Sequence, residues 1–446
     1  MVLALGLGGV ATEGITKRGK RGRARLLVVL CATSLLALEA IRAPPTAAHP
    51  GLATRAELSR TSPISQLEVA AAFTRRSYTP ETRARLRVWA RTRRLTLRVF
   101  LSGPGNSRFN GEPVTEAHTR PWAVSSWPRT ISIKVGAWPS GLYFVRLTAR
   151  DGRVGFAPFI VRPRWGATPP PIAVVLSTNT WEAYNFRDMN GDGTGDTWYA
   201  DRSIHVVNLA RPYLPPGMPP PAGRGGVFPF LRWLYGHGKS ADFFADDDFA
   251  RFPSGRWLAA RYALLVFAGH EEYVTPTEYD LTVSACNHGE NLVFISANNF
   301  FYRVSRIDSR LFGRTRWRDL GRPEAALVGV QYVDWWHGVF GMRPYVVTGA
   351  RVAPWMFTGT GLSNGDRFGR FGVEVDARAP SSPPQTRLLA RAKDIFGPGK
   401  SAEMCYYRTS RGAKVFAAGV MNFTVHADRL IIDKLLTNVF AKLEVR

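Results

Sequence analysis

The spacing of the hydrophobic residues changes at a proline-rich segment, residues 162–171 (RPRWGATPPP), and this change constrains the fold more than any other feature. Before the segment, hydrophobic and polar residues alternate, which is the period of strands with one buried face. After it, hydrophobic residues form short unbroken runs, the pattern of strands buried on both faces. Because proline lacks a backbone donor and stiffens the chain, we interpret the segment as a linker between two domains.

The part of the chain before the linker shows period-two alternation in several short segments separated by turns. The turns include residues 138–141 (WPSG). Short alternating strands without a helical stretch predict a β-sandwich of the immunoglobulin type at residues 61–164. The expected strands cover residues 86–90, 95–101, 131–135, 142–147 and 156–161.

The part after the linker alternates between apolar runs and helical patterns. The runs cover residues 172–177, 263–268, 291–297 and 414–419, and the helical patterns cover residues 228–235, 278–288 and 427–443. Such alternation predicts an α/β domain at residues 170–446, with a doubly wound, mainly parallel sheet. Ligands of such sheets bind beyond the carboxyl ends of the strands.

The N-terminus carries the three parts of a secretory signal peptide. Basic residues precede an apolar run at residues 26–38, and small residues follow at 46–48. The run is shorter than the roughly 20 residues of a spanning helix. We therefore expect residues 1–48 to be a signal peptide cleaved after Ala48, which leaves an extracellular or cell-surface protein without a stable membrane span. An uncleaved anchor is the alternative.

The formal charge of +25 comes mostly from scattered arginines. Nucleic-acid binders concentrate basic residues on one element, and after residue 48 no run of five Lys or Arg occurs. We therefore expect no nucleic-acid partner. Of the three cysteines, Cys31 lies in the signal peptide, so Cys286 and Cys405 either form a disulfide in an oxidising compartment or are two buried apolar residues.

Polar and aromatic residues follow three of the predicted buried strands. They are residues 178–185 (TNTWEAYN), 269–273 (GHEEY) and 298–303 (NNFFYR). Because the carboxyl ends of parallel strands meet at one edge, we expect these segments to converge on one site. The sequence has no G-x-S-x-G elbow, no H-E-x-x-H motif and no P-loop, which argues against serine hydrolases, zinc proteases and P-loop enzymes.

From about residue 86 to the C-terminus the chain resembles the family of the N,N-dimethylformamidase large (beta) subunit. The resemblance depends on the order and spacing of short motifs, which are GLY at 141–143, FAPFIVRP at 156–163, TWEAYN at 180–185, GHEEY at 269–273, NNFFY at 298–302, GVEVD at 372–376 and VFAAGVMN at 415–422. It implies a catalytic domain similar to class I glutamine amidotransferases.

The resemblance also implies an iron-dependent hydrolase acting on a small-molecule amide C–N bond. Tyr273, Tyr302 and Glu374 match the iron ligands, with Tyr184 as the alternative to Tyr302. Phenolate and carboxylate are hard donors suited to a ferric Lewis acid, which polarises a carbonyl and activates water. His270 or Glu272 would then transfer protons. We assign substrate contacts to Trp181, Tyr184, Asn185, Asn298 and Asn422.

A different class of function remains open. The same strand ends, with Trp181, Tyr184 and Tyr273, also suit a non-catalytic secreted module whose groove binds a cell-surface sugar or peptide. Either function is compatible with a homo-oligomer.

An acidic loop at residues 188–196 (DMNGDGTGD) resembles the first part of a calcium-binding loop. Asp188, Asn190, Asp192 and Asp196 occupy loop positions 1, 3, 5 and 9. Position 12 is Tyr199 instead of the usual glutamate. The loop predicts bound calcium, and the alternative is an Asp/Asn/Gly surface turn without an ion.

Overall fold

The computed structural model describes residues 68–104, 111–124, 128–214, 217–219, 226–338 and 341–445. The predicted signal peptide, residues 1–48, lies outside this range. None of the helices formed by the described residues is both long enough and apolar enough to cross a membrane.

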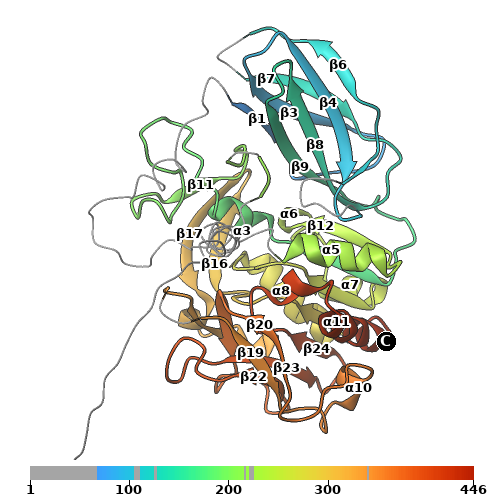
Figure 1. Cartoon of the computed structure of the whole chain (residues 1–446), viewed down its shortest axis with the longest axis vertical. Helices are drawn as coiled ribbons and strands as arrows, with labels where there is room; N and C mark the ends of the chain where they lie inside the picture. Colours follow the sequence, from blue (N-terminus) through green and yellow to red (C-terminus); the bar gives the residue numbers. More distant parts are fainter. Residues whose placement is uncertain are drawn as a thin grey trace, which may run out of the picture. The chain divides into compact units, whose positions relative to one another are not determined.

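Two β-sheets that share one hydrophobic core form the first part of the described chain (Figure 1). In β3 (Arg83–Ala90), Ala84, Leu86 and Val88 are buried while Arg83 and Arg85 are exposed. This alternation confirms the predicted strands. One sheet has the order β1 (Val69–Phe73), β3, β7 (Arg129–Lys134), and the other β2 (Ser77–Tyr78), β9 (Val154–Val161), β8 (Gly141–Ala149), β4 (Arg94–Leu101), β5 (Glu112–Pro113), with β6 (His118–Pro121) on β4.

A nine-stranded mixed sheet organises the second part. Five strands, β12 (Ala241–Ala245), β10 (Ile172–Leu176), β13 (Leu264–Phe267), β15 (Asn291–Phe294) and β24 (Lys414–Ala417), are parallel neighbours in that order. The sheet continues with antiparallel pairings through β23 (Ala402–Arg408), β22 (Arg387–Ala392), β19 (Arg343–Val347) and β20 (Arg367–Phe371).

Two smaller sheets accompany it. One has the order β11 (Val206–Asn208), β17 (Arg310–Arg316), β16 (Tyr302–Ile307), β14 (Tyr273–Val274), and the other pairs β18 (Gln331–Trp335) with β21 (Glu374–Ala377).

The predicted fold class, a doubly wound, mainly parallel sheet of the glutamine amidotransferase type, is wrong. Strands predominate over helices among the described residues, and they form several mixed sheets. The prediction is wrong because unbroken apolar runs mark only β10, β13, β15 and β24, whereas other strands carry charged residues and lack such runs. One such strand is β22 (RLLARA), whose arginines are not fully buried.

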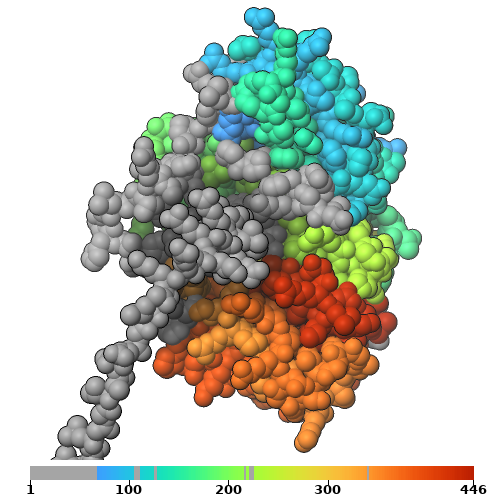
Figure 2. Space-filling model, viewed as in Figure 1, coloured from blue at the N-terminus to red at the C-terminus, as the bar shows by residue number. Residues whose placement is uncertain are grey.

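Helices cover both faces of the parallel strands. Val174 and Leu176 of β10 enter a core with α5 (Val227–Gly236) and α11 (Leu430–Leu443), whereas Ala173 and Val175 enter a second core with α7 (Gly255–Arg261) and α8 (Pro276–Asn287). Figure 2 shows the yellow-green surface near α5 beside the red surface of the C-terminal segment. The remaining helical turns are α3 (Thr178–Ala183), α6 (Asp246–Phe249), η1 (Trp317–Leu320), α9 (Ala325–Val328), α10 (Pro354–Phe357) and η2 (Phe423–His426).

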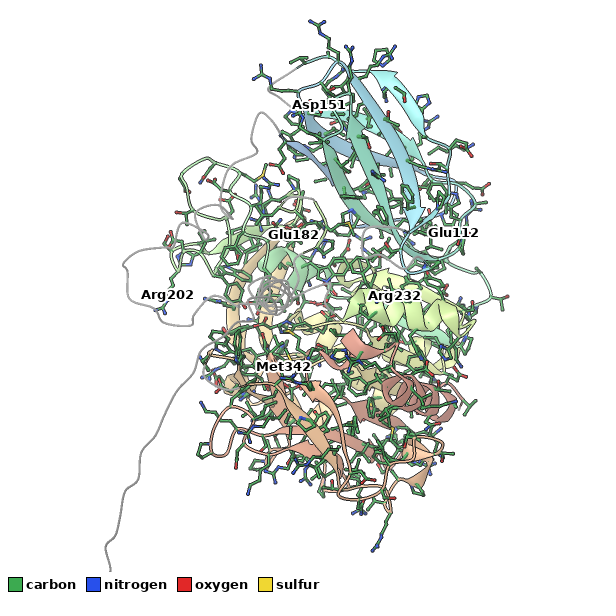
Figure 3. All side chains as sticks on the ribbon, viewed as in Figure 1. Glu112, Asp151, Glu182, Arg202, Arg232 and Met342 are labelled. Atoms are coloured by element: carbon green, nitrogen blue, oxygen red, sulfur yellow. The ribbon has the colours of Figure 1, made fainter. Side chains whose placement is uncertain are left out.

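Buried polar contacts join β2 and the residue before it to α6 and α3, which directly follow strands of the nine-stranded sheet. The hydroxyl of Ser77 donates to Oδ1 of Asp248 over 2.7 Å. The guanidinium of Arg76 pairs with the carboxylate of Glu182, a fully buried residue labelled in Figure 3. The predicted domain boundaries, 61–164 and 170–446, stay a prediction.

Cys286 and Cys405 are buried and not bridged to each other. Of the two alternatives drawn from the sequence, the structure therefore has buried free thiols.

Candidate functional site

The segment after β13 brings a histidine and two glutamates together. Nε2 of His270 lies 3.3 Å from Oε2 of Glu272 and 3.4 Å from Oε2 of Glu374, which is the first residue of β21. All three side chains are buried. Successive side chains of an extended segment point to opposite sides, and accordingly Glu271 has Asp246 and Glu278 as its charged neighbours instead.

Tyrosine hydroxyls surround the carboxylate of Glu272. The hydroxyl of Tyr184 donates to Oε2 over 2.8 Å, and the hydroxyl of Tyr199 donates to Oε1 over 3.2 Å. Tyr199 also shares a hydrogen bond with the hydroxyl of Tyr273. The parallel pairing of β14 and β16 sets Tyr273 opposite Tyr302, and the two rings stack with centroids 5.4 Å apart.

Asn298 fixes the second carboxylate. Its Nδ2 donates to Oε2 of Glu374 and its backbone N–H donates to Oδ1 of Asp376, each over 2.8 Å. Asn298 has φ 55 and Val373 has φ 71. A positive φ is strained for a β-branched residue such as Val373, and strain of this kind concentrates at functional sites.

We call these residues the Glu272–Glu374 cluster: Tyr184, Tyr199, His270, Glu272, Tyr273, Asn298, Tyr302 and Glu374.

Burial shifts the protonation of the cluster toward neutral groups. It raises the pKa of Glu272 to about 7, and together with the charge of Glu272 it raises the pKa of Glu374 well above the usual range. Burial also lowers the pKa of His270 to about 3, so its imidazole is neutral at pH 7. The pKa of the Tyr273 hydroxyl is well above its ordinary value for the same reason. A cation bound here would favour the charged carboxylates and phenolates.

Arg314 of β17 covers the tyrosines. Its guanidinium lies 5.6 Å from the ring centroid of Tyr199 and 5.7 Å from that of Tyr302, within the range of cation–π contacts. The side chain therefore places a positive charge over the aromatic side of the cluster.

Three residues that we assigned to substrate binding lie elsewhere. Trp181 packs in a hydrophobic core, where it is 2% exposed. The Nδ2 atom of Asn185 donates to Glu182 over 2.9 Å. Asn422 accepts from the backbone N–H of Gly372 over 3.0 Å. The structure thus brings Tyr184 and Asn298 into the cluster and gives Asn185 and Asn422 backbone and side-chain partners outside it.

The sequence did not identify three residues of the site, which are Tyr199 of the cluster and its neighbours Asp376 and Arg314. Tyr199 comes three residues after the acidic loop, at position 12 of the calcium-loop pattern, and the absence of the usual glutamate there was the only sequence signal. Asp376 lies in the same GVEVD motif as Glu374, and that proximity could have identified it. Arg314 comes from β17, where all residues but one are exposed or half-buried, so the segment resembles an ordinary solvated strand.

The side-chain oxygens of the acidic loop accept hydrogen bonds from backbone N–H groups of the same loop. Asp188 accepts from the N–H groups of Gly191 and Gly193 over 2.6 and 2.9 Å. Asp192 accepts from Thr194, and Asp196 accepts from Met189. Asn190 donates to Asp192 over 2.9 Å. Calcium in this loop stays a prediction.

Across the described part of the chain, no group of three or more His, Cys, Asp and Glu side chains is arranged to hold a metal ion. An iron site at the cluster would therefore need tyrosine oxygens as well as carboxylates. Tyr273 and Tyr302, whose rings stack beside each other in the cluster, carry oxygens of that kind.

The sequence matches the family model described as "N,N-dimethylformamidase beta subunit-like, C-terminal" over residues 89–434. No curated protein matches the chain.

Similar solved structures include a superoxide reductase (neelaredoxin) from Ignicoccus hospitalis, which is 12% identical, with 25% of this chain and 100% of that chain covered and a TM-score of 0.17. A cycloisomaltooligosaccharide glucanotransferase from Paenibacillus sp. is 12% identical, with 26% of this chain and 18% of that chain covered and a TM-score of 0.16. At these TM-scores, neither structure supports a conclusion about the fold or the function of this chain.

Proposed function

Because the chain belongs to the N,N-dimethylformamidase beta subunit-like family, we propose that the Glu272–Glu374 cluster hydrolyses an amide C–N bond of a small molecule with the help of bound iron. The observation that carries the proposal is the burial of two glutamates, a neutral histidine and hydrogen-bonded tyrosines in one cluster.

The side chains present suit a ferric ion. Both ring nitrogens of His270 lack a hydrogen-bond partner among the described residues, although Nε2 faces two carboxylates. An unsatisfied buried polar atom is costly, and a cation beside two carboxylates would also remove their mutual repulsion. Tyr273, Tyr302 and Glu374 would hold the iron, since phenolate and carboxylate oxygens are hard donors. Ferric iron supplies Lewis acidity toward an amide carbonyl and a water molecule.

The remaining residues position groups and move protons. Glu272 would take a proton from the attacking water at its carboxylate and return it to the departing amine. The hydroxyls of Tyr184 and Tyr199 orient that carboxylate by donating to it. Asn298 orients Glu374 by donating from Nδ2. His270, Glu272 and Glu374 are buried, and polar interactions are stronger at sites from which water is excluded.

The location and ligand of the protein form part of the same proposal. Residues 1–48 direct export, so the substrate would be a small molecule met outside the cytoplasm. The family description makes N,N-dimethylformamide the first amide to test, followed by formamide and acetamide.

The test is amine or ammonia release by purified, iron-loaded protein. We expect turnover of at least one amide and a loss of about 100-fold or more in Glu272→Gln, the range of general acid–base catalysis. The control is Glu290→Gln, a buried glutamate in the turn between α8 and β15. No release from any amide by folded, iron-loaded protein, or equal rates for Glu272→Gln and the wild type, would contradict the proposal.

A further inference from the structure

A cavity of about 800 Å³ lies apart from the Glu272–Glu374 cluster. Parts of five segments line it, which are residues 73–76 at the end of β1 and just after it, residues 209–210 just after β11, the residues of α6 and just after it, the start of α8, and the β16–β17 hairpin. None of the eight residues of the cluster is among those lining it. Its volume is in the range of sites for small organic ligands.

Arginine guanidiniums outnumber their acidic partners in the cavity wall. Arg251 and Arg306 share one carboxylate, that of Asp247, at 3.5 and 3.4 Å. Arg75 is exposed and forms no ion pair with a described residue. Arg76, the fourth arginine of the wall, pairs with the buried Glu182 and contributes little free charge.

The two other acidic residues of the wall oppose this charge only in part. Glu278 turns its carboxyl toward Thr275, from which Oε2 accepts both the hydroxyl and the backbone N–H. Burial raises the pKa of Glu278 well above its usual range. Asp308 is exposed at the tip of the hairpin. Arg306 also donates to the backbone oxygen of Asp308 and to Oδ1 of Asn179. Two guanidiniums, those of Arg251 and Arg306, thus share the carboxylate of Asp247, and the exposed Arg75 adds a third positive charge to the wall.

The first turn of α8 and several hydroxyl groups in the wall also favour anions. Helix α8 has 12 residues, and its first turn, with Thr275 as the N-cap, lines the cavity. The N-terminus of a helix carries a partial positive charge that favours anions. The hydroxyls of Thr277, Ser305 and Ser309 also lie in the wall. Planar guanidiniums with nearby hydroxyls suit oxyanions, which accept paired hydrogen bonds.

We propose that this cavity binds a small organic anion through a carboxylate or phosphate group held by Arg251, Arg306 and Arg75. The site is independent of the proposed hydrolysis, because it uses no residue of the cluster. It gives the protein a second ligand, whether or not the cluster is active.

The full chain is titrated with citrate and with inorganic phosphate in an isothermal titration calorimeter. Thermal melts are then recorded with and without each anion. We expect saturable binding of at least one anion and a raised melting midpoint, since a ligand of the folded state stabilises it. Arg306→Gln and Arg251→Gln should each weaken binding about tenfold, the effect of losing one charge-assisted hydrogen bond. Citrate alone would identify a carboxylate ligand, and phosphate alone a phosphate ligand.

The matched control is Arg256→Gln, which removes the same charge from the exposed face of α7 and does not line the cavity. Arg251 is 66% exposed, so its substitution leaves the fold intact even if Arg306→Gln destabilises it. Absence of saturable binding of either anion would overturn the proposal. Equal weakening by Arg256→Gln and Arg251→Gln would also overturn it, because binding would then depend only on net charge.

Discussion

The hydroxyl of Tyr199 is hydrogen-bonded to the hydroxyl of Tyr273, although the two residues come from a loop and from a strand after β13. Tyr199 also donates to Glu272, so one side chain orders both a proposed iron ligand and the proposed general base. The acidic loop at residues 188–196 ends three residues before Tyr199, so the two are close in sequence.

We expect Tyr199→Phe to lower amide turnover about tenfold, because Glu272 and Tyr273 both lose a hydrogen bond that orients them. The fold should remain, since the ring stacks on Tyr184 with centroids 4.5 Å apart and phenylalanine keeps that contact. Steady-state rates and circular dichroism check both points. Tyr279→Phe, which changes a tyrosine of α8 outside the cluster, is the control, and equal rates for the two variants would contradict the role of Tyr199.

Because Glu182 lies in a buried ion network, we expect its replacement by glutamine to lower the stability of the protein strongly. Glu182 pairs with Arg76 and lies 3.6 Å from Arg211, and all three are buried. Glu182→Gln leaves two buried guanidiniums without a carboxylate, which costs about 3–5 kcal/mol in the free energy of unfolding. Denaturant unfolding measures it. Glu81→Gln breaks the exposed pair with Arg164 and should cost less than about 1 kcal/mol. A small effect of Glu182→Gln would show that the network is dispensable.

The raised pKa of Asp246 predicts how the free energy of unfolding depends on pH. Burial raises the pKa of Asp246 from its ordinary 3.8 to about 7 in the folded protein. The folded state therefore holds a proton that the unfolded state releases, so this contribution to stability is present below pH 4 and is lost as the pH rises through about 7. The slope is at most about 1.4 kcal/mol per pH unit.

Asp246→Asn should flatten the pH dependence of the unfolding free energy between pH 4 and 8, because an amide does not titrate there. Denaturant unfolding at a series of pH values measures the slope. The exposed Asp280→Asn is the control and should leave the slope unchanged. The predicted sign would be wrong if the wild-type protein became more stable as the pH rises from 4 to 8 and Asp246→Asn did not.

The acidic loop predicts a calcium-dependent melting temperature. If Asp188, Asn190, Asp192 and Asp196 bind calcium, the midpoint should rise with millimolar calcium and fall with chelator. Asp192→Ala should remove the difference. Identical midpoints for the wild-type protein in calcium and in chelator would leave the Asp/Asn/Gly turn as the interpretation, consistent with the hydrogen bonds that the loop makes to itself.

The sequence predicted the position of the cluster better than the fold around it. GHEEY and NNFFY follow β13 and β15, which are parallel neighbours, so the convergence of Tyr273 and Tyr302 could be expected from unbroken apolar runs. Glu374 came from the family resemblance alone, because β21 pairs with β18 outside the main sheet.

Other features had no readable sequence signal. The antiparallel strands β19, β20, β22 and β23 carry arginines and other polar residues on partly exposed positions, so they lack the apolar runs that marked the parallel strands. Tyr199 and Arg314 reach the cluster from a loop and a hairpin, and tertiary packing alone decides such contacts. Trp181 was expected at a surface groove and is in the core, because a strand-end aromatic can face either way.

Iron content together with the visible absorption spectrum of the purified protein tests the central claim most directly, because phenolate bound to ferric iron absorbs visible light. The account predicts about one iron per chain and a coloured protein. Tyr273→Phe and Glu374→Gln should lose both, and Tyr279→Phe should keep both. A folded wild-type protein that stays colourless and iron-free after incubation with ferric iron would contradict the account and favour a non-catalytic secreted binding module.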